Sequence, residues 1–111
     1  MQPVEMALEA ALIVIRNGGS TVAANRTFTD IAKGYKKQGV STVWRLDFIA
    51  ATTEAEGRSS TFVRPVGPIG VNLGRVSEVA VLGERVARGE VALAHLDAEV
   101  ARIKELPSPY N

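Results

Sequence analysis

The sequence contains no cysteine, a single histidine and few aromatic residues, and it has almost no net charge. Without cysteine, the chain can form neither a disulfide framework nor a thiolate metal site. Its 13 basic and 12 acidic residues give a net charge of +1, whereas nucleic-acid-binding proteins usually concentrate a large positive excess. We therefore expect no nucleic-acid partner, and the absence of cysteine is compatible with a cytosolic protein.

Long apolar runs are also missing. The most apolar segment, residues 6–15, is interrupted by Glu9 and followed by Arg16. A membrane-spanning helix needs about 20 predominantly apolar residues, and a secretory signal needs a basic start and a small-residue cleavage site. The sequence therefore predicts a soluble chain. Its 111 residues, 46% of them hydrophobic, are enough for one domain with a modest core.

Two helices are predicted in the first third of the chain. The segment Val4–Arg16 is apolar around most of its circumference, which is typical of a helix that is buried on several sides. Gly18 ends this helix, and Ser20 or Thr21 can cap the next one, which is expected over residues 22–37. The predicted inner face of the second helix comprises Ala24, Phe28, Ile31, Ala32 and Tyr35.

Gly39 is the expected left-handed end of the second helix, and two strands follow it. Residues 41–53 alternate with a period of two, which predicts one strand with a single buried face. That face would consist of Trp44, Leu46, Phe48 and Ala50. A polar turn then leads into a second strand, residues 60–64, in which Ser60 and Arg64 can face water. Because an isolated hairpin is marginal in water, it must pack on the helices or be completed by strands of a partner chain.

A strand, a broken loop and a helix follow one another in the middle of the chain. Two prolines and two glycines interrupt the loop, and Asn72 is well suited to cap the helix after it. Gly89 separates that helix from a last one over residues 91–106, with residues 107–111 as a linker. The expected apolar face of the last helix is Leu93, Leu96, Val100 and Ile103. The prediction is an α+β domain over residues 1–106, built from two helices, a β-hairpin and two further helices.

Few residues suggest chemistry. His95 lies on the last predicted helix, where a surface position is much more common than a catalytic one. Glu54 and Glu56 belong to a predicted turn, and Asp97 and Glu99 lie on different faces of a helix, so solvated carboxylates are the simplest interpretation. We therefore expect no enzyme, with no catalytic residue, no cofactor and no metal.

The loop Gly67–Gly70 leads towards the helix at Asn72 and suggests two kinds of site. A G-x-x-G loop that clamps RNA would join two helices, whereas this loop joins a strand to a helix. Free N–H groups at the helix start, with Arg64 and Arg75 nearby, could instead bind a carboxylate or phosphate. The plainer interpretation is that proline and glycine shape the turn and that Asn72 is a cap. Arg64, Gly70 and Asn72 are the candidate residues for binding a small carboxylate.

Four short motifs occur in order along the chain: Gly18-Gly19-Ser20-Thr21, Gly70-Val71-Asn72-Leu73, Gly89-Glu90 and Pro109-Tyr110. Together with the arginine-containing strand before the second motif, they resemble the amino-terminal domain of the threonine/serine exporter family. The resemblance covers nearly the whole chain and implies a soluble domain that precedes a multi-pass membrane region. Related split versions are associated with the export of dicarboxylates such as succinate.

The resemblance implies a domain on the cytoplasmic face of the inner (plasma) membrane, belonging to an exporter of threonine, serine or related organic acids. It would gate, recognise cargo or hold subunits together. Its partners would be a membrane-embedded region of the same or a companion chain, and further copies of itself. The alternative is a free-standing module that forms homo-oligomers through an exposed strand edge. A hydrolase using Asp47 or a hydroxyl nucleophile is a third option, but it lacks an activating base.

Overall fold

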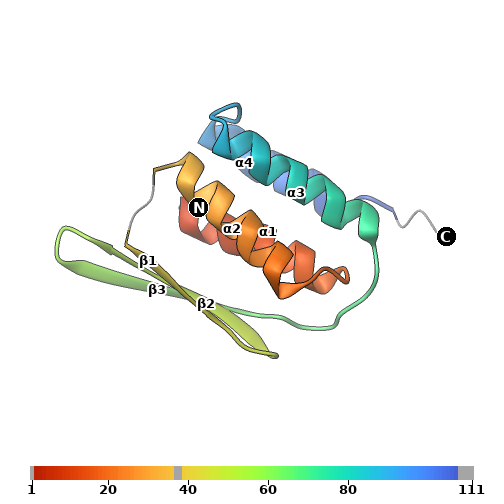
Figure 1. Cartoon of the computed structure of the whole chain (residues 1–111), viewed down its shortest axis with the longest axis horizontal. Coiled ribbons are helices and arrows are strands. Elements are labelled where there is room, and N and C mark those ends of the chain that lie inside the picture. The colour runs from red at the N-terminus through yellow and green to blue at the C-terminus, as the bar shows by residue number, and fades with distance from the viewer. Residues whose placement is uncertain (1, 37–38, 108–111) are drawn as a thin grey trace.

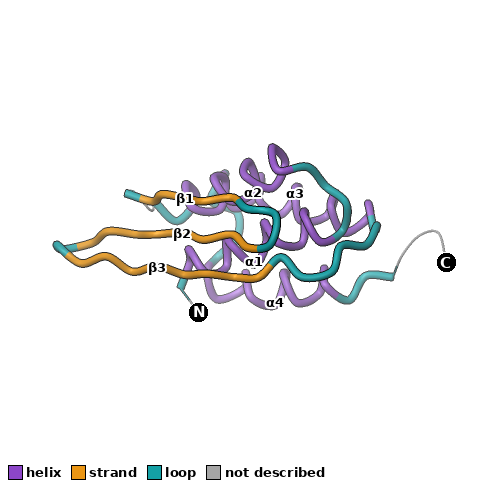
Figure 2. Tube along the Cα trace, turned by 90° about the horizontal axis from the view of Figure 1, so that it is seen from below, coloured by secondary structure: helices purple, strands orange, loops and turns teal. Residues whose placement is uncertain are grey.

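Three layers make up the fold of the computed structural model, which describes residues 2–36 and 39–107 (Figure 1). An antiparallel sheet with the strand order β1-β2-β3 is one outer layer, α1 and α2 form the middle layer, and α3 and α4 lie on their other side. The elements are α1 (Pro3–Arg16), α2 (Thr21–Gly34), β1 (Val40–Trp44), β2 (Phe48–Ala55), β3 (Arg58–Pro65), α3 (Leu73–Ala87) and α4 (Leu93–Lys104). Figure 2 shows the strands side by side with the helices behind them. The predicted α+β class and the order helices, strands, helices are confirmed.

Helix α1 is the most deeply buried element. Nine of its 14 residues are buried, and it packs against α2, α3, α4 and β2. The prediction that this helix is covered on several sides is therefore confirmed. Pro3 occupies its first turn, where no intrahelical donor is needed, and the Gln2 N–H donates to Glu5 Oε1 (3.3 Å). Its buried residues are Val4, Met6, Ala7, Leu8, Ala10, Ala11, Leu12, Ile13 and Val14.

Helices α2 and α3 approach each other closely at Gly34, the last residue of α2. A Cβ atom placed on Gly34 would lie 2.2 Å from the carbonyl oxygen of Val86, so only glycine fits without a shift of α3. The sequence predicts a longer helix, but α2 ends here and Lys36 has a φ of 58°; residue 37 lies outside the described residues. The predicted inner face is confirmed, since Ala24, Phe28, Ile31 and Ala32 are buried and Tyr35 packs against the core.

Residues 41–53 belong to two strands, and the prediction of a single strand is wrong. The Arg45 N–H donates to the Phe48 carbonyl (2.9 Å) and closes a turn between β1 and β2. Because the chain reverses there, the side chains facing the helices have even numbers in β1 and odd numbers in β2. Leu46, predicted on the buried face, is 98% exposed, whereas Ile49 is 2% exposed. The sheet face towards the helices carries Trp44 and Ile49, which are paired in register, and Ala51 and Phe62, which are also paired.

Helices α3 and α4 begin and end within two residues of their predicted limits. Asn72 caps α3 as predicted, since its Oδ1 accepts from the Arg75 N–H (3.2 Å). On α4, the predicted residues Leu96, Val100 and Ile103 are buried. Leu93 is 41% exposed, contrary to prediction, because Val91 just before the helix is buried at that end instead. Of the predicted linker, Pro107 is exposed and residues 108–111 lie outside the described part of the chain.

We expect Gly34→Ala to lower the free energy of unfolding by about 1–3 kcal/mol, because the added methyl group would overlap the backbone of α3. The matched control is Gly83→Ala in α3. A Cβ atom there would lie at an ordinary 3.5 Å from Thr27 Cγ2, so this change should be neutral or should stabilise by up to about 1 kcal/mol through helix propensity. Urea denaturation measures both, and equal effects would contradict the close approach.

Candidate functional site

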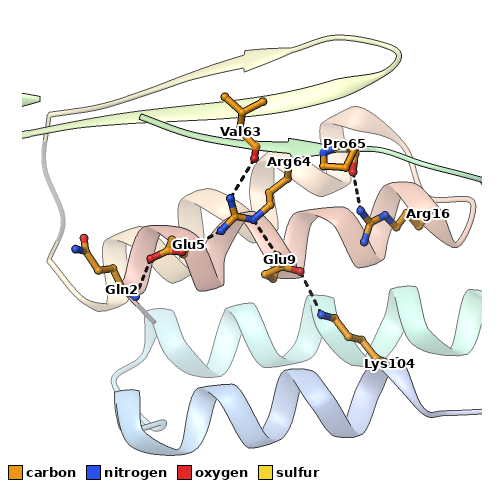
Figure 3. A network of polar contacts seen from close by, with 8 residues as sticks. All are labelled: Gln2, Glu5, Glu9, Arg16, Val63, Arg64, Pro65 and Lys104. Carbon is orange, nitrogen blue, oxygen red and sulfur yellow. Dashed lines mark hydrogen bonds and ion pairs between the residues drawn. The ribbon is translucent and has the colours of Figure 1, made fainter. Parts of the chain in front are cut away.

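Arg64 of β3 points towards α1, where it contacts two carboxylates (Figure 3). Its Nη2 lies 2.9 Å from Glu5 Oε2, and its Nε lies 3.2 Å from Glu9 Oε1. The prediction that Arg64 can face water is wrong. Arg64 and Phe62 are two residues apart on one strand, so they share the face that covers the helices.

Lys104 extends this arrangement to a third element, since its Nζ on α4 lies 3.2 Å from Glu9 Oε2. Glu9 therefore joins β3 to α4 across α1. We call Glu5, Glu9, Arg64 and Lys104 the Arg64 cluster. The side chains of Glu5 and Glu9 are only 22% and 16% exposed, and they lie one helical turn apart. Like charges at this spacing repel, so the cations of β3 and α4 stabilise a helix that has acidic residues in a largely apolar surrounding.

A second set of polar contacts ties the loop over residues 66–72 to the end of α1. Arg16 donates through Nε to the Val66 carbonyl and through Nη2 to the Pro65 carbonyl, both at 2.6 Å. In return, the Gly70 N–H donates to the Arg16 carbonyl (2.8 Å), and the Asn72 N–H donates to the Asn17 carbonyl (3.0 Å). Carbonyls at a helix end have no partner within the helix, and the loop supplies donors to them.

Asn72 lies at the centre of this junction and is 4% exposed. Besides capping α3, it donates through Nδ2 to the Leu106 carbonyl (3.1 Å). Arg75 Nε donates to the same carbonyl (2.8 Å), and Arg75 Nη1 donates to Asn17 Oδ1 (3.3 Å). The junction therefore fastens the ends of α1 and α4 to the beginning of α3. We call Arg16, Asn17, Gly70, Asn72 and Arg75, with the carbonyl of Leu106, the helix-end junction.

The three residues predicted to bind a carboxylate do not form one site. Gly70 and Asn72 are in the helix-end junction, whereas Arg64 contacts Glu9. Since Glu9 and Arg16 are seven residues apart on α1, the two places are separated by roughly 10 Å along the helix. Each predicted residue already has intramolecular hydrogen-bonding partners. A carboxylate would have to compete with them, and the binding site stays a prediction.

Of the glycines predicted to shape turns, Gly18 and Gly89 follow the ends of α1 and α3. The prediction that Gly39 ends the second helix is wrong, because α2 ends at Gly34 and Gly39 lies directly before β1. Gly18, Gly39 and Gly89 have φ values of 94°, 66° and 74°. Thr21 is the first residue of α2, and the cap is Ser20, whose Oγ accepts from the Ala23 N–H (3.0 Å).

The residues considered for acid–base chemistry are dispersed. His95 is exposed on α4, and Glu54 and Glu56 are exposed at the β2–β3 hairpin. Within residues 2–36 and 39–107, no three histidine or acidic side chains are close enough to hold a metal ion. An open hollow of about 510 Å³ between α2 and β1 is lined by Lys33 and Lys36. Both lysines are exposed and contribute positive charge to this hollow.

Tyr35, Arg88 and Glu90 have shifted pKa values but keep their ordinary ionisation states. Burial raises the pKa of Tyr35, whose hydroxyl donates to the Val91 carbonyl (3.1 Å). On the surface, the hydrogen bond between Arg88 and Glu90 raises the pKa of the guanidinium and lowers that of the carboxylate. Near pH 7, Tyr35 is neutral and Arg88 and Glu90 are charged, as each would be in water. These shifts therefore prepare none of the three groups for proton transfer.

Sequence reasoning missed most of the residues that these contacts use: Glu5, Glu9, Arg16, Asn17 and Lys104. One signal was available, because Glu9 interrupts the apolar run over residues 6–15 and a carboxylate in such a place needs a cation. Which cation it contacts could not be read from the sequence, since Arg64 and Lys104 are 55 and 95 residues away.

We expect Arg64→Met to lower the free energy of unfolding by about 1–2 kcal/mol, because it leaves two neighbouring carboxylates with reduced compensation. Arg102→Met is the control. Arg102 pairs with Glu99 on the surface, with 51% of its side chain exposed, and such exposed pairs contribute little to stability. Adding Glu5→Gln to Arg64→Met should restore part of the loss. Equal losses in the two arginine variants, measured by urea denaturation, would contradict a stabilising Arg64 cluster.

None of the helices within residues 2–36 and 39–107 is long and apolar enough to cross a membrane. The family described as "Putative threonine/serine exporter" (ThrE) matches residues 5–111. Comparison with curated proteins gave no match, and comparison with solved structures gave none either. The family match begins in the first turn of α1 and covers every later element, including both polar sets. The resemblance seen in the motifs is thereby confirmed, and the chain belongs to the threonine/serine exporter family.

Proposed function

We propose that this chain is the cytoplasmic domain of an exporter of threonine, serine or related organic acids. A membrane-embedded region of the same or a companion chain would move the cargo, and the domain would gate that region or hold its subunits together. The observation that carries the proposal is the family match over residues 5–111. The proposal places the translocation path in another segment or chain.

The contacts of the polar residues favour gating or assembly over cargo recognition. A binding site for a small amino acid usually offers polar groups that are free to bind the ligand. Here the guanidinium of Arg64 is held by Glu5 and Glu9, and the side chain of Asn72 is both a cap and a donor to the Leu106 carbonyl. Releasing these groups for a ligand would break contacts of α1 with β3 and of α3 with the end of α4. This arrangement therefore suits a rigid domain that acts in gating or assembly better than one that binds cargo.

The second candidate is a free-standing module that forms homo-oligomers, and the strand edges favour it. In the described chain, β1 and β3 are the two outer strands of the sheet. The inward-pointing Arg64 on β3 is a feature that discourages edge pairing, whereas β1 has neither proline nor charge. Pairing through β1 would extend the sheet into a second copy. A monomer in light scattering at high protein concentration would eliminate this candidate.

We predict that cells producing the membrane region without this chain lose most of their threonine and serine efflux, and that restoring the chain restores efflux. The amount of membrane region in the membrane is the control, because a loss of that region would mimic loss of gating. Efflux at the same rate with and without the chain, at equal amounts of membrane region, would contradict the proposal.

A thermal denaturation series separates the roles within the proposal. Ligands that bind the folded state raise the melting temperature. If the domain gates or assembles, then threonine, serine and succinate at millimolar concentration leave the melting temperature of the isolated chain unchanged. A rise with any of them that is lost in Asn72→Ser would assign cargo recognition to the helix-end junction.

A further inference from the structure

The most exposed apolar side chains lie at one end of the molecule. Among the described residues, four large apolar side chains are more than 60% exposed: Val22 (80%), Leu46 (98%), Ile69 (62%) and Val71 (68%). They belong to the start of α2, the β1–β2 turn and the loop before α3. Figure 1 shows these segments at the end where α1 and α4 finish, opposite the β2–β3 hairpin. We call these four residues the apolar end.

Hydrogen bonds and shared surface connect the segments of the apolar end. The Val66 N–H donates to the Asp47 carbonyl (2.9 Å), which holds the turn with Leu46 against the start of the loop. The Asn72 N–H donates to the Asn17 carbonyl and fixes the other end of the loop beside the α1–α2 turn. Val22 lines a surface hollow together with Trp44. The exposed side chains therefore project from a scaffold that the helix-end junction holds in place.

The chain also leaves the last helix at this end. Asn72 and Arg75 both donate to the carbonyl of Leu106, which fixes the residue after α4 beside the beginning of α3. A membrane-embedded region joined to this domain through residues after Leu106 would start next to the apolar end. A companion chain would find there the part of the surface with the most exposed apolar side chains, and exposed apolar patches commonly mark interaction sites.

The charges at the apolar end decide between a protein and a lipid surface. Arg16 and Arg75 are engaged with carbonyls and with Asn17, and Arg45 and Asp47, on either side of Leu46, have opposite charges. Binding to anionic lipid headgroups depends on clustered lysine and arginine that can reach the phosphate groups, whereas the guanidinium groups of Arg16 and Arg75 are held by carbonyls of the chain itself. The core of a protein interface, in contrast, is apolar and depleted of charge.

We propose that the apolar end is the surface through which this domain docks on the membrane-embedded region of the exporter, and that the surface it meets is an apolar, weakly charged protein surface. This inference rests on the proposed function. It assigns the contact to Val22, Leu46, Ile69 and Val71, and it leaves the β2–β3 hairpin at the opposite end in water.

Cysteine labelling tests the proposal cleanly, because the chain has no cysteine of its own. Leu46→Cys and Ile69→Cys place single thiols on the apolar end, and Ser59→Cys places a control thiol on the exposed hairpin. Each variant is labelled with a water-soluble maleimide, as the isolated chain and in membranes that contain the exporter region. At positions 46 and 69 labelling should be at least about fivefold slower in those membranes, as expected if four-fifths of the domains are docked. Position 59 should react equally in both.

Equal labelling rates at positions 46 and 69 with and without the exporter region would overturn the proposal, as would equal protection of position 59. Two further labelling experiments test whether the apolar end binds a lipid bilayer or a second copy of the chain instead. Protection of the isolated chain by phosphatidylcholine or phosphatidylglycerol vesicles alone would assign the apolar end to the bilayer and overturn the proposal. Protection that appears when the isolated chain is concentrated would assign it to a second copy, with the same consequence.

Efflux measured with the same cysteine variants separates failure of the docking surface from failure of the proposed function. If threonine and serine efflux requires the chain but positions 46 and 69 label freely, only the docking surface is wrong. If efflux does not require the chain, the proposed function itself fails. Circular dichroism of each variant verifies that the fold is kept, which is expected because Leu46 and Ile69 are both largely exposed.

Discussion

The burial of α1 is the constraint on which the rest of the structure depends. A helix that is apolar on nearly all sides cannot be covered by one neighbour, and α1 is accordingly in contact with the sheet on one side and with three helices on the others. Leu8 and Leu12, which are 0% and 1% exposed, each contribute on the order of 1.5–3 kcal/mol through removal of their side chains from water. The other elements are arranged so that their own apolar faces meet this helix.

The two polar sets follow from that burial. A covered helix still has acidic side chains and an end with unpaired carbonyls, and both need partners in a place with little water. The Arg64 cluster provides cations for Glu5 and Glu9, and the helix-end junction provides donors for the carbonyls of Arg16 and Asn17. The same junction holds the apolar end, so the part of the domain proposed to meet the membrane region is connected directly to the core helix.

Features that depend on neighbouring residues could be predicted from the sequence. The apolar circumference of α1 and the cap at Asn72 each follow from residues within one or two helical turns. The β1–β2 turn could not be predicted, because Arg45, Leu46 and Asp47 include neither glycine nor proline and fit the alternating pattern of a strand. Arg64 points inward because it is paired with the buried Ile49. This pairing could not be predicted without the β1–β2 turn. The candidate site was affected most, because the partners of Arg64 and Asn72 come from distant parts of the chain.

Native-state hydrogen exchange tests the central role of α1 most directly. The slowest amide protons of a protein exchange only through global unfolding, and they belong to its most protected core. The account predicts that amides in the buried centre of α1, around Leu8–Leu12, are the slowest in the chain, with an opening free energy equal to the global free energy of unfolding from urea denaturation. If amides of α3 or of the sheet remain protected while α1 exchanges faster, α1 is not the element on which the fold depends.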